Sequence, residues 1–213
     1  MPASSVPDSS RQQRRREQTR ARLIAAAKNL VAVHGVDGVG LSEITEAADL
    51  GAGTFYNYFR SRDDIVEAVV EESIESVGAR LDKLTASLSD PAEVFSFSLR
   101  HLVRQAVTDP VWGWFVVRLG VAHPKLLAIL GPRCARDLRQ GVDSGRFTIP
   151  DIELATACVF GALLSTLRYT LSRESAAHVE ETFAQTMLGM VGVPADEAWD
   201  VASRELPDLP GAE

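Results

Sequence analysis

The sequence has few cysteines and no long uninterrupted run of apolar residues. Its two cysteines, Cys134 and Cys158, form neither a disulfide framework nor a metal-type pair, which favours a reduced interior. The longest apolar-rich stretch, Leu154 to Leu167, is interrupted by hydroxyl residues and is shorter than the roughly 18 residues that suggest a membrane span. The N-terminal residues have no apolar signal-peptide core. We therefore expect a soluble cytoplasmic protein without a membrane partner.

Patterns typical of catalysis are also missing. The four histidines, His34, His101, His123 and His178, are scattered, and none has the spacing of a metal-ligand set. There is neither an evident nucleophile with its base nor a glycine loop that would cradle phosphate. We expect no catalytic residues, no metal and no cofactor. A helical enzyme whose groups converge only in space is a remote alternative.

Positive charge is scarce overall but unevenly distributed. The net charge is −7. Residues 1–62 hold nine Lys/Arg and six Asp/Glu (+3), whereas residues 63–213 hold thirteen and twenty-three (−10). Only the N-terminal part is therefore suited to meet phosphate. Its run Arg14, Arg15 and Arg16 is either a flexible arm that contacts phosphates or the minor groove, or a solvated helix start.

Two short helical patterns flank a turn between Gly40 and Arg62. In the first, Leu41, Ile44 and Ala48 recur at helical spacing, and the turn begins near Asp49. In the second, Phe55 and Phe59 share one face, leaving polar neighbours on the other. This is the pattern of a helix-turn-helix, whose second helix reads the DNA major groove. The expected DNA contacts are Ser42, Ala52, Gly53, Thr54, Tyr56, Asn57, Tyr58 and Arg62, together with the Arg14–Arg16 run.

The segment from Thr19 to Val70 resembles the DNA-binding domain of the TetR family of bacterial transcriptional repressors. The matching residues are Leu23-Ile24-Ala25-Ala26-Ala27, Leu30, Gly35, Ile44, Ala48, Gly53-Thr54-Phe55-Tyr56-Asn57-Tyr58-Phe59, and Arg62 where the family usually has lysine. The resemblance implies that Arg62 contacts phosphate, although Arg62 could instead cap a helix.

Four positions depart from the family pattern. Thr45 stands where alanine is favoured, and Gly51 where a capping serine is favoured. Asp49 replaces a glycine, so we expect it to adopt the left-handed backbone conformation. Ala52 replaces a longer polar side chain, and its methyl group can contact only a thymine methyl.

Prolines mark the expected helix starts in the remaining chain. A long helix is expected from Asp63, and Asp90-Pro91, Asp109-Pro110 and His123-Pro124 each predict a helix start. Two long helices are expected at about 151–171 and 175–191, with a short one after Pro194. Strand-like alternation is absent throughout.

The middle helices hold the candidate ligand chamber, because they combine large apolar surface with a few polar groups. The alternative for each aromatic residue is an ordinary place in the core, and His101 and Arg104 could be solvated. The expected ligand-binding residues are Phe97, His101, Arg104, Trp112, Phe115, Arg118 and Cys158.

The penultimate long helix is apolar nearly all round and must be covered on most sides. In TetR-like proteins the last two long helices pair with their symmetry mates, which implies a homodimer. The expected interface residues are Cys158, Gly161, Ala162 and Ser165. The alternative is a helix buried within its own subunit.

The sequence thus predicts an all-α protein with an N-terminal three-helix DNA-binding domain and a C-terminal helical domain for ligand binding and dimerisation. The expected boundaries are a disordered basic arm over 1–16, the helix-turn-helix domain over 17–62, the ligand and dimer domain over 63–205, and a tail over 206–213. The expected function is a repressor released from a palindromic operator by a small apolar or amphipathic effector. A helix-turn-helix activator, or a regulator without a ligand, is the alternative.

Overall fold

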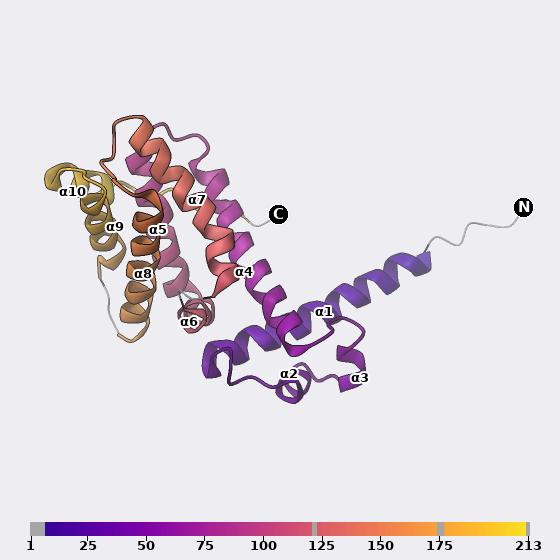
Figure 1. The fold of residues 1–213 in the computed structure, drawn as a ribbon. Helices are drawn as coiled ribbons and strands as arrows, with labels where there is room; N and C mark the ends of the chain where they lie inside the picture. Colours follow the sequence, from indigo (N-terminus) through magenta and orange to yellow (C-terminus); the bar gives the residue numbers. More distant parts are fainter. Residues whose placement is uncertain (1–6, 121–122, 174–176, 212–213) are drawn as a thin grey trace, which may run out of the picture. The chain divides into compact units, whose positions relative to one another are not determined.

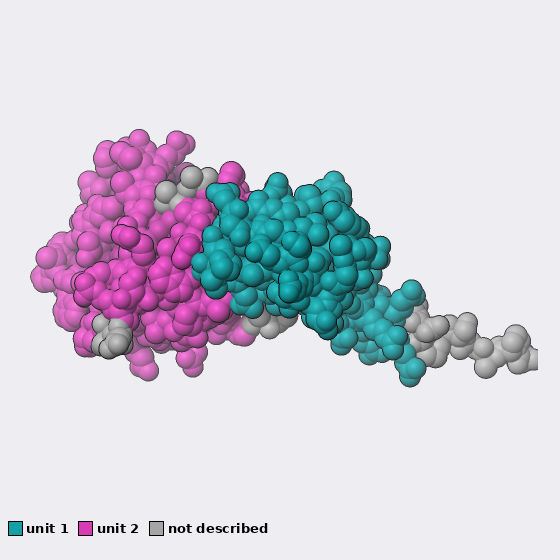
Figure 2. Space-filling view, turned by 90° about the horizontal axis from the view of Figure 1, so that it is seen from below, with its two compact units in different colours: residues 1–69 teal, residues 70–213 magenta. Residues whose placement is uncertain are grey.

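The computed structural model describes residues 7–120, 123–173 and 177–211. Within these ranges the chain forms ten α-helices and no strand, which confirms the predicted all-α class (Figure 1). The chain divides into two compact units, Met1–Val69 and Val70–Glu213, coloured separately in Figure 2. The boundary lies within one helix, α4 (Arg62–Thr85), so this helix contributes residues to both units.

The first unit is built on α1 (Pro7–His34), α2 (Leu41–Ala47) and α3 (Ala52–Phe55). Its core holds fully buried apolar side chains from each part of the unit: Leu23, Ala27, Val31, Ile44, Phe55 and Ile65. Gly35 follows α1 with a φ of 76°, a conformation that glycine adopts without strain and that commonly ends helices.

Helix α1 begins earlier than the sequence analysis expected. Residues 7–16 are helical, so the expectation of a disordered arm is wrong for these residues, while residues 1–6 lie outside the described ranges. Between Pro7 and Gly35 the chain contains no proline or glycine that would break a helix. In addition, Gln13 donates to Glu17 one turn later at 3.2 Å. The N-terminal half of α1 projects beyond α2 and α3 (Figure 1).

The three helix starts predicted at Pro91, Pro110 and Pro124 are confirmed. Helix α5 (Pro91–Thr108) is capped by Asp90, whose carboxylate accepts from the Ala92 amide, and α6 (Pro110–Leu119) is capped by Asp109 in the same way. Helix α7 (Pro124–Asp143) begins at the third of these prolines. Carboxylates at these positions satisfy amides that the first helical turn leaves without partners.

The second unit packs α5 against α6, α7, α8 and α9. Helix α8 (Ile152–Leu171) starts and ends within one residue of its expected bounds, whereas α9 (Val179–Met190) begins four residues later than expected. Part of the expected start of α9, residues 174–176, lies outside the described residues. Helix α10 (Ala195–Ser203) is the short helix expected after Pro194. Residues 206–211 do not form a loose tail, because Leu206 is buried and Pro210 accepts a hydrogen bond from Arg80.

Candidate DNA-binding surface and effector cavity

The turn between α2 and α3 has the geometry predicted for it. Asp49 has a φ of 52°, the left-handed conformation expected where it replaces glycine. The Leu50 amide donates to the Thr45 carbonyl at 2.9 Å, which closes the end of α2. From α1, the Arg22 guanidinium donates to the Ala48 carbonyl at 2.6 Å. The turn is therefore fixed both by its own backbone and by α1.

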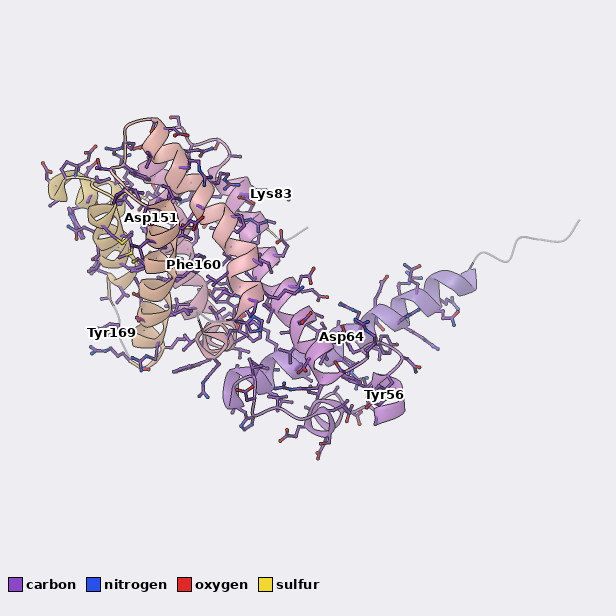
Figure 3. All side chains as sticks on the ribbon, in the orientation of Figure 1. Tyr56, Asp64, Lys83, Asp151, Phe160 and Tyr169 are labelled. Atoms are coloured by element: carbon purple, nitrogen blue, oxygen red, sulfur yellow. The ribbon has the colours of Figure 1, made fainter. Side chains whose placement is uncertain are left out.

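The exposed side of α3 carries the polar groups that the sequence pattern placed there. Phe55 and Phe59 are buried, with exposed fractions of 0% and 4%, whereas Tyr56 is 60% exposed. Asn57 is exposed and Thr54 half-buried, and Figure 3 marks Tyr56 beside α3. Hydroxyl and amide groups presented in this way can hydrogen-bond to base edges and phosphates.

The backbone at the start of α3 is open to close approach. Ala52 and Gly53 are exposed, and a Cβ atom added at Gly53 would meet no atom within 4 Å. Internal packing therefore does not require glycine here, whereas contact with an external surface would benefit from it. Ser42 is exposed on α2.

Basic residues of α1 lie next to this surface. Arg14, Arg15 and Arg16 are exposed on successive positions of α1. The Arg16 guanidinium lies 5.9 Å from the Tyr58 ring centre. A cation–π contact of this kind links α1 to the half-buried Tyr58 that follows α3.

Two arginines differ in their suitability for phosphate contact. Arg62 donates through Nε to the Val39 carbonyl at 2.9 Å and pairs with Asp63 at 2.7 Å. Its geometry therefore favours a structural role that holds the loop before α2. Arg60, which is not among the predicted DNA contacts, has a side chain that is 92% exposed. Its position shortly after α3 in the sequence could have indicated a phosphate contact.

The second unit contains a partly open cavity between α4, α5, α7 and α8. It offers about 50 Å³ to the centre of a water molecule. Most of its lining is apolar, and Phe160, labelled in Figure 3, comes from α8. The lining residues are Leu81, Asp82, Thr85, Phe95, Ser98, Leu99, Leu102, Leu130, Arg133, Cys134, Arg136, Asp137, Val159, Phe160 and Leu163.

Two aspartates and two arginines form a charged cluster on the α4–α7 wall of the cavity. Asp82 accepts from Arg133 at 2.8 Å and from Arg136 at 2.8 Å, while Asp137 accepts from Arg136 at 2.9 Å. Arg133 also reaches Glu75 at 2.6 Å. Each charge therefore has an opposite charge within hydrogen-bond distance, which allows it to lie beside an apolar cavity.

The two aspartates of this cluster have pKa values shifted in opposite directions. Burial disfavours the charged form of both carboxyls. For Asp82, the hydrogen bonds from Arg133 and Arg136 outweigh burial and hold its pKa below the usual range. For Asp137, burial prevails over Arg136, so its pKa lies above the usual range. Burial also raises the pKa of the Cys134 thiol to about 12, so this thiol stays protonated.

None of the predicted ligand residues lines this cavity. Phe97, Trp112 and Phe115 are core side chains, with exposed fractions of 4%, 3% and 0%. The structure also places the polar candidates elsewhere: His101 is buried near the C-terminal residues, Arg104 pairs with Glu180, Arg118 lies 5.8 Å from the Trp114 ring centre, and Cys158 is exposed.

A usable signal for the cavity was present in α7. Arg133 and Asp137 lie one turn apart and continue the stripe of Leu126 and Leu130. Charged residues on the apolar stripe of a helix indicate either a buried ion pair or a polar site. The ligand site predicted from sequence was based on clustered aromatic residues instead.

The candidate interface residues lie on the side of α8 that the single chain leaves open. Cys158 and Ser165 are exposed, and Gly161 and Ala162 are half-buried. An open groove between α8 and α9 is lined by Ala162, Ser165, Thr166, Tyr169, Ala177, Val179, Thr182, Phe183, Thr186 and Met187.

Helix α8 is also long and apolar enough, by composition, to cross a membrane. Its most apolar stretch has a mean hydropathy of 1.4 and is only 33% buried within one chain. However, α8 packs against α5, α6, α7 and α9, as a core helix does. Among the residues that the structure describes, no group of three or more His, Cys, Asp or Glu side chains could hold a metal ion.

Comparison with known proteins assigns the family. Residues 23–69 match the model described as bacterial regulatory proteins of the tetR family, and residues 90–204 match the tetracyclin repressor-like C-terminal domain. The chain belongs to the TetR family. It is therefore a helix-turn-helix, DNA-binding transcriptional regulator and not an enzyme, as the sequence predicted.

Among solved structures, RolR in complex with the ligand resorcinol is 52% identical. The match covers 93% of this chain and 100% of RolR, with a TM-score of 0.74. The fatty acid degradation regulator FadR from Bacillus halodurans is 20% identical over 83% of this chain and 97% of FadR, with a TM-score of 0.69, and shares the fold.

Curated TetR-family relatives match over very different shares of this chain. The transcriptional repressor NemR of Escherichia coli K12 is 36% identical over 69 residues. That match covers 32% of this chain and 35% of NemR, so the chain spans about a third of that relative. The transcriptional regulator UidR of the same strain is 23% identical over 190 residues, covering 82% of this chain and 91% of UidR.

Proposed function

We propose that this chain is a cytoplasmic homodimeric repressor that leaves a palindromic operator when a small phenol, such as resorcinol, occupies the cavity between α4, α5, α7 and α8. The observation that carries the proposal is the cavity itself. It combines an apolar lining with carboxylate and guanidinium groups on one wall. The 52% identity to RolR, whose structure contains resorcinol, supports the same ligand class.

The chemistry of the lining suits an aromatic ring that carries hydroxyl groups. Phe95 and Phe160, together with the leucines, provide apolar contact for a ring. A phenol hydroxyl has a pKa of about 10, so it is protonated at neutral pH and can donate to Asp82 or Asp137. It can also accept from Arg133 or Arg136. A ring without hydroxyls would leave these groups without new partners, and we expect it to bind poorly.

Release from DNA would follow from movement of the cavity wall. The cavity offers about 50 Å³, so a ring can enter only if the walls move apart; an apolar cavity that holds benzene measures about 150 Å³. One wall is α4, which contributes Leu81, Asp82 and Thr85 to the cavity and Ile65 to the core of the first unit. An effector that prefers the widened cavity would shift α4 and thereby disfavour the DNA-competent state.

We infer that two copies pair through the open sides of α8 and α9. Only a third of the most apolar stretch of α8 is buried in one chain, and the neighbouring groove contains Ala162 and Ser165. Two α3 surfaces, each with Thr54, Tyr56 and Asn57, would then read half-sites about 34 Å apart, one turn of duplex.

Calorimetric titration with resorcinol tests the effector assignment. Wild-type protein should bind, and Asp137→Asn should bind about 10- to 100-fold more weakly because a hydrogen bond to the carboxylate is lost. Asp143→Asn, an exposed position at the end of the same helix, is the matched control. In gel shifts, resorcinol should release operator DNA from the wild type and the control.

Arg118→Ala separates this cavity from the segment that the sequence analysis favoured. Arg118 is exposed and does not line the cavity, so its removal should leave resorcinol binding unchanged. If Arg118→Ala weakens binding while folded Asp137→Asn retains wild-type affinity, the site lies near α6. A wild type that does not bind resorcinol would refute the phenolic effector.

A further inference from the structure

The last described residues form an extended segment that follows α10. Arg204 has φ and ψ of −56° and 150°, which are polyproline II values. The next residues contain Pro207 and Pro210, whose rings fix φ and force each preceding leucine into an extended conformation. A polyproline II helix has three residues per turn, so carbonyls three positions apart lie on one side. We call residues 204–211 the C-terminal strap.

Three side chains hold the strap at this three-residue spacing. Arg100 donates through Nη1 to the Arg204 carbonyl at 2.6 Å. The His101 ring donates to the Pro207 backbone carbonyl. Arg80 donates through Nε to the Pro210 carbonyl at 2.7 Å. The first two donors belong to α5 and the third to α4, so the strap links these two helices.

The donors on α5 are buried and depend on the strap. Arg100 is 3% exposed, and its other charged contacts are the longer pairs with Glu180 and Glu181, at 3.7 and 3.9 Å. The Nε2 atom of His101 has no hydrogen-bond partner, so the strap carbonyl is an important partner of this ring. Leu206, 9% exposed, adds apolar contact. A loose tail would not bury these groups.

The strap and the effector cavity use different sides of the same helices. Arg80 is followed by Leu81 and Asp82, which line the cavity, and successive helical positions are turned by 100°. On α5, Leu99 and Leu102 line the cavity and flank the strap-binding pair. The strap therefore links α4 to α5 outside the cavity that these helices enclose.

We propose that the C-terminal strap is an intramolecular clamp that opposes widening of the cavity and so raises the effector concentration needed for a response. This inference rests on the proposed effector function of the cavity. A ring can enter only if the walls separate, and the strap hydrogen bonds resist separation of α4 from α5. Removing the clamp lowers the cost of opening, and the effector then binds more tightly.

Two variants test the clamp, each in the dimeric, otherwise unchanged protein. One ends the chain at Glu205, and the other, Arg80→Met, removes one donor but retains an apolar stem. Arg139→Met, an exposed arginine of α7, is the matched control. Hydrogen exchange of α4 amides is measured without ligand, and resorcinol affinity by calorimetry. Both strap variants should exchange faster over residues 77–85 and bind resorcinol about two- to thirty-fold more tightly, a typical range for changes in coupling.

The two readouts separate this inference from the effector proposal. Unchanged α4 exchange in the folded variants overturns the clamp, whatever resorcinol does. Where the wild type binds resorcinol, faster exchange with unchanged or weaker resorcinol affinity in the strap variants also overturns the clamp, because the strap would then stabilise α4 without opposing ligand entry. If the wild type does not bind resorcinol, the effector proposal fails, and the clamp on the cavity fails with it only if α4 exchange is also unchanged.

Discussion

The two units of this regulator place their functional groups in opposite ways. In the first unit the candidate DNA contacts are outside, and Tyr56 is 60% exposed. In the second unit the polar groups that matter are inside, with Asp137 8% and His101 5% exposed. An exposed group can be removed without loss of packing, whereas a buried polar group must keep its partners for the fold itself. Substitutions should therefore separate binding from stability in the first unit but not in the second.

The charge distribution follows the same division. Residues 1–62 carry +3 and residues 63–213 carry −10. Positive charge on the reading surface attracts phosphate, while the acidic remainder is repelled by it. Several arginines of the second unit are engaged in ion pairs, such as Arg133 with Glu75 and Asp82, and Arg146 with Asp90. The second unit thus uses arginine mainly for internal structure.

The open side of α8 is the part of the second unit that we expect to bind another copy of the chain. Ala162→Glu would place an unpaired charge in the proposed seam, at a cost of several kcal/mol, and we expect a monomer or an aggregate. Sedimentation velocity measures the outcome. Ala128→Glu, on an exposed position of α7, is the control and should remain dimeric. A soluble Ala162→Glu dimer of normal affinity would place the interface elsewhere.

Buried His101 should make the stability of the second unit depend on pH. Burial lowers the pKa of its imidazole from 6.5 to about 4. The hydrogen bond to the Pro207 carbonyl and the negative charge of Glu180 raise this pKa, whereas the positive charges of Arg104 and Arg100 lower it further. Between these values the unfolded chain binds a proton that the folded chain does not. The contribution of neutral His101 to the free energy of unfolding is therefore complete above pH 6.5. It decreases as the pH is lowered toward 4, by at most about 3 kcal/mol.

Denaturant unfolding of His101→Gln checks this dependence. Glutamine can still donate to the Pro207 carbonyl but does not titrate, so the fall in stability between pH 6.5 and 4 should be smaller than in the wild type. His34→Gln, at the exposed end of α1, should follow the wild-type curve. Parallel curves for wild type and His101→Gln would contradict a neutral, buried imidazole.

The same division explains what could be predicted from sequence. The helix-turn-helix is specified within a short contiguous segment, so the inward aromatics Phe55 and Phe59 followed from local pattern. The left-handed conformation of Asp49 followed from the family resemblance, in which Asp49 stands where glycine is favoured. The caps at Asp90 and Asp109 are equally local. Each depends on neighbours within one or two helical turns.

The cavity could not be predicted in that way, because its charged cluster joins Asp82 of α4 to residues of α7 some fifty positions later. Only tertiary packing brings them together. The aromatic residues near Trp112 are buried and do not line this cavity, and large apolar side chains are buried wherever a core exists, so their clustering alone does not indicate a site. The start of α1 was misjudged for another reason: its composition is polar, yet nothing in it breaks a helix.

The exposed α3 surface should lose DNA affinity without losing stability. Tyr56→Phe combined with Asn57→Ala should weaken operator binding, with each lost base contact worth about 1 to 3 kcal/mol, while the unfolding midpoint stays near that of the wild type. Gel shifts at fixed salt and thermal unfolding measure the two effects. Asn29→Ala, exposed on α1, is the control. Wild-type affinity in the folded double variant would remove these residues from the interface.

The smallest effect is expected from the basic run of α1, because exposed charges act on DNA mainly through counterion release. Replacing Arg14, Arg15 and Arg16 with alanine should lower the slope of log affinity against log salt by about 0.9 for each lost phosphate contact. All three residues are exposed, but Arg16 also contacts Tyr58. A second variant that replaces only Arg14 and Arg15 keeps this contact and therefore leaves the α3 surface in place. Affinity for operator and for random DNA should fall together, since phosphates carry no sequence information.

The control is the Arg118→Ala, Arg139→Ala double variant, which removes two exposed charges from the second unit and should leave the slope unchanged. A slope that stays at the wild-type value in the triple variant would mean that the N-terminal half of α1 does not touch DNA, and that the positive charge of the first unit acts through other residues such as Arg60.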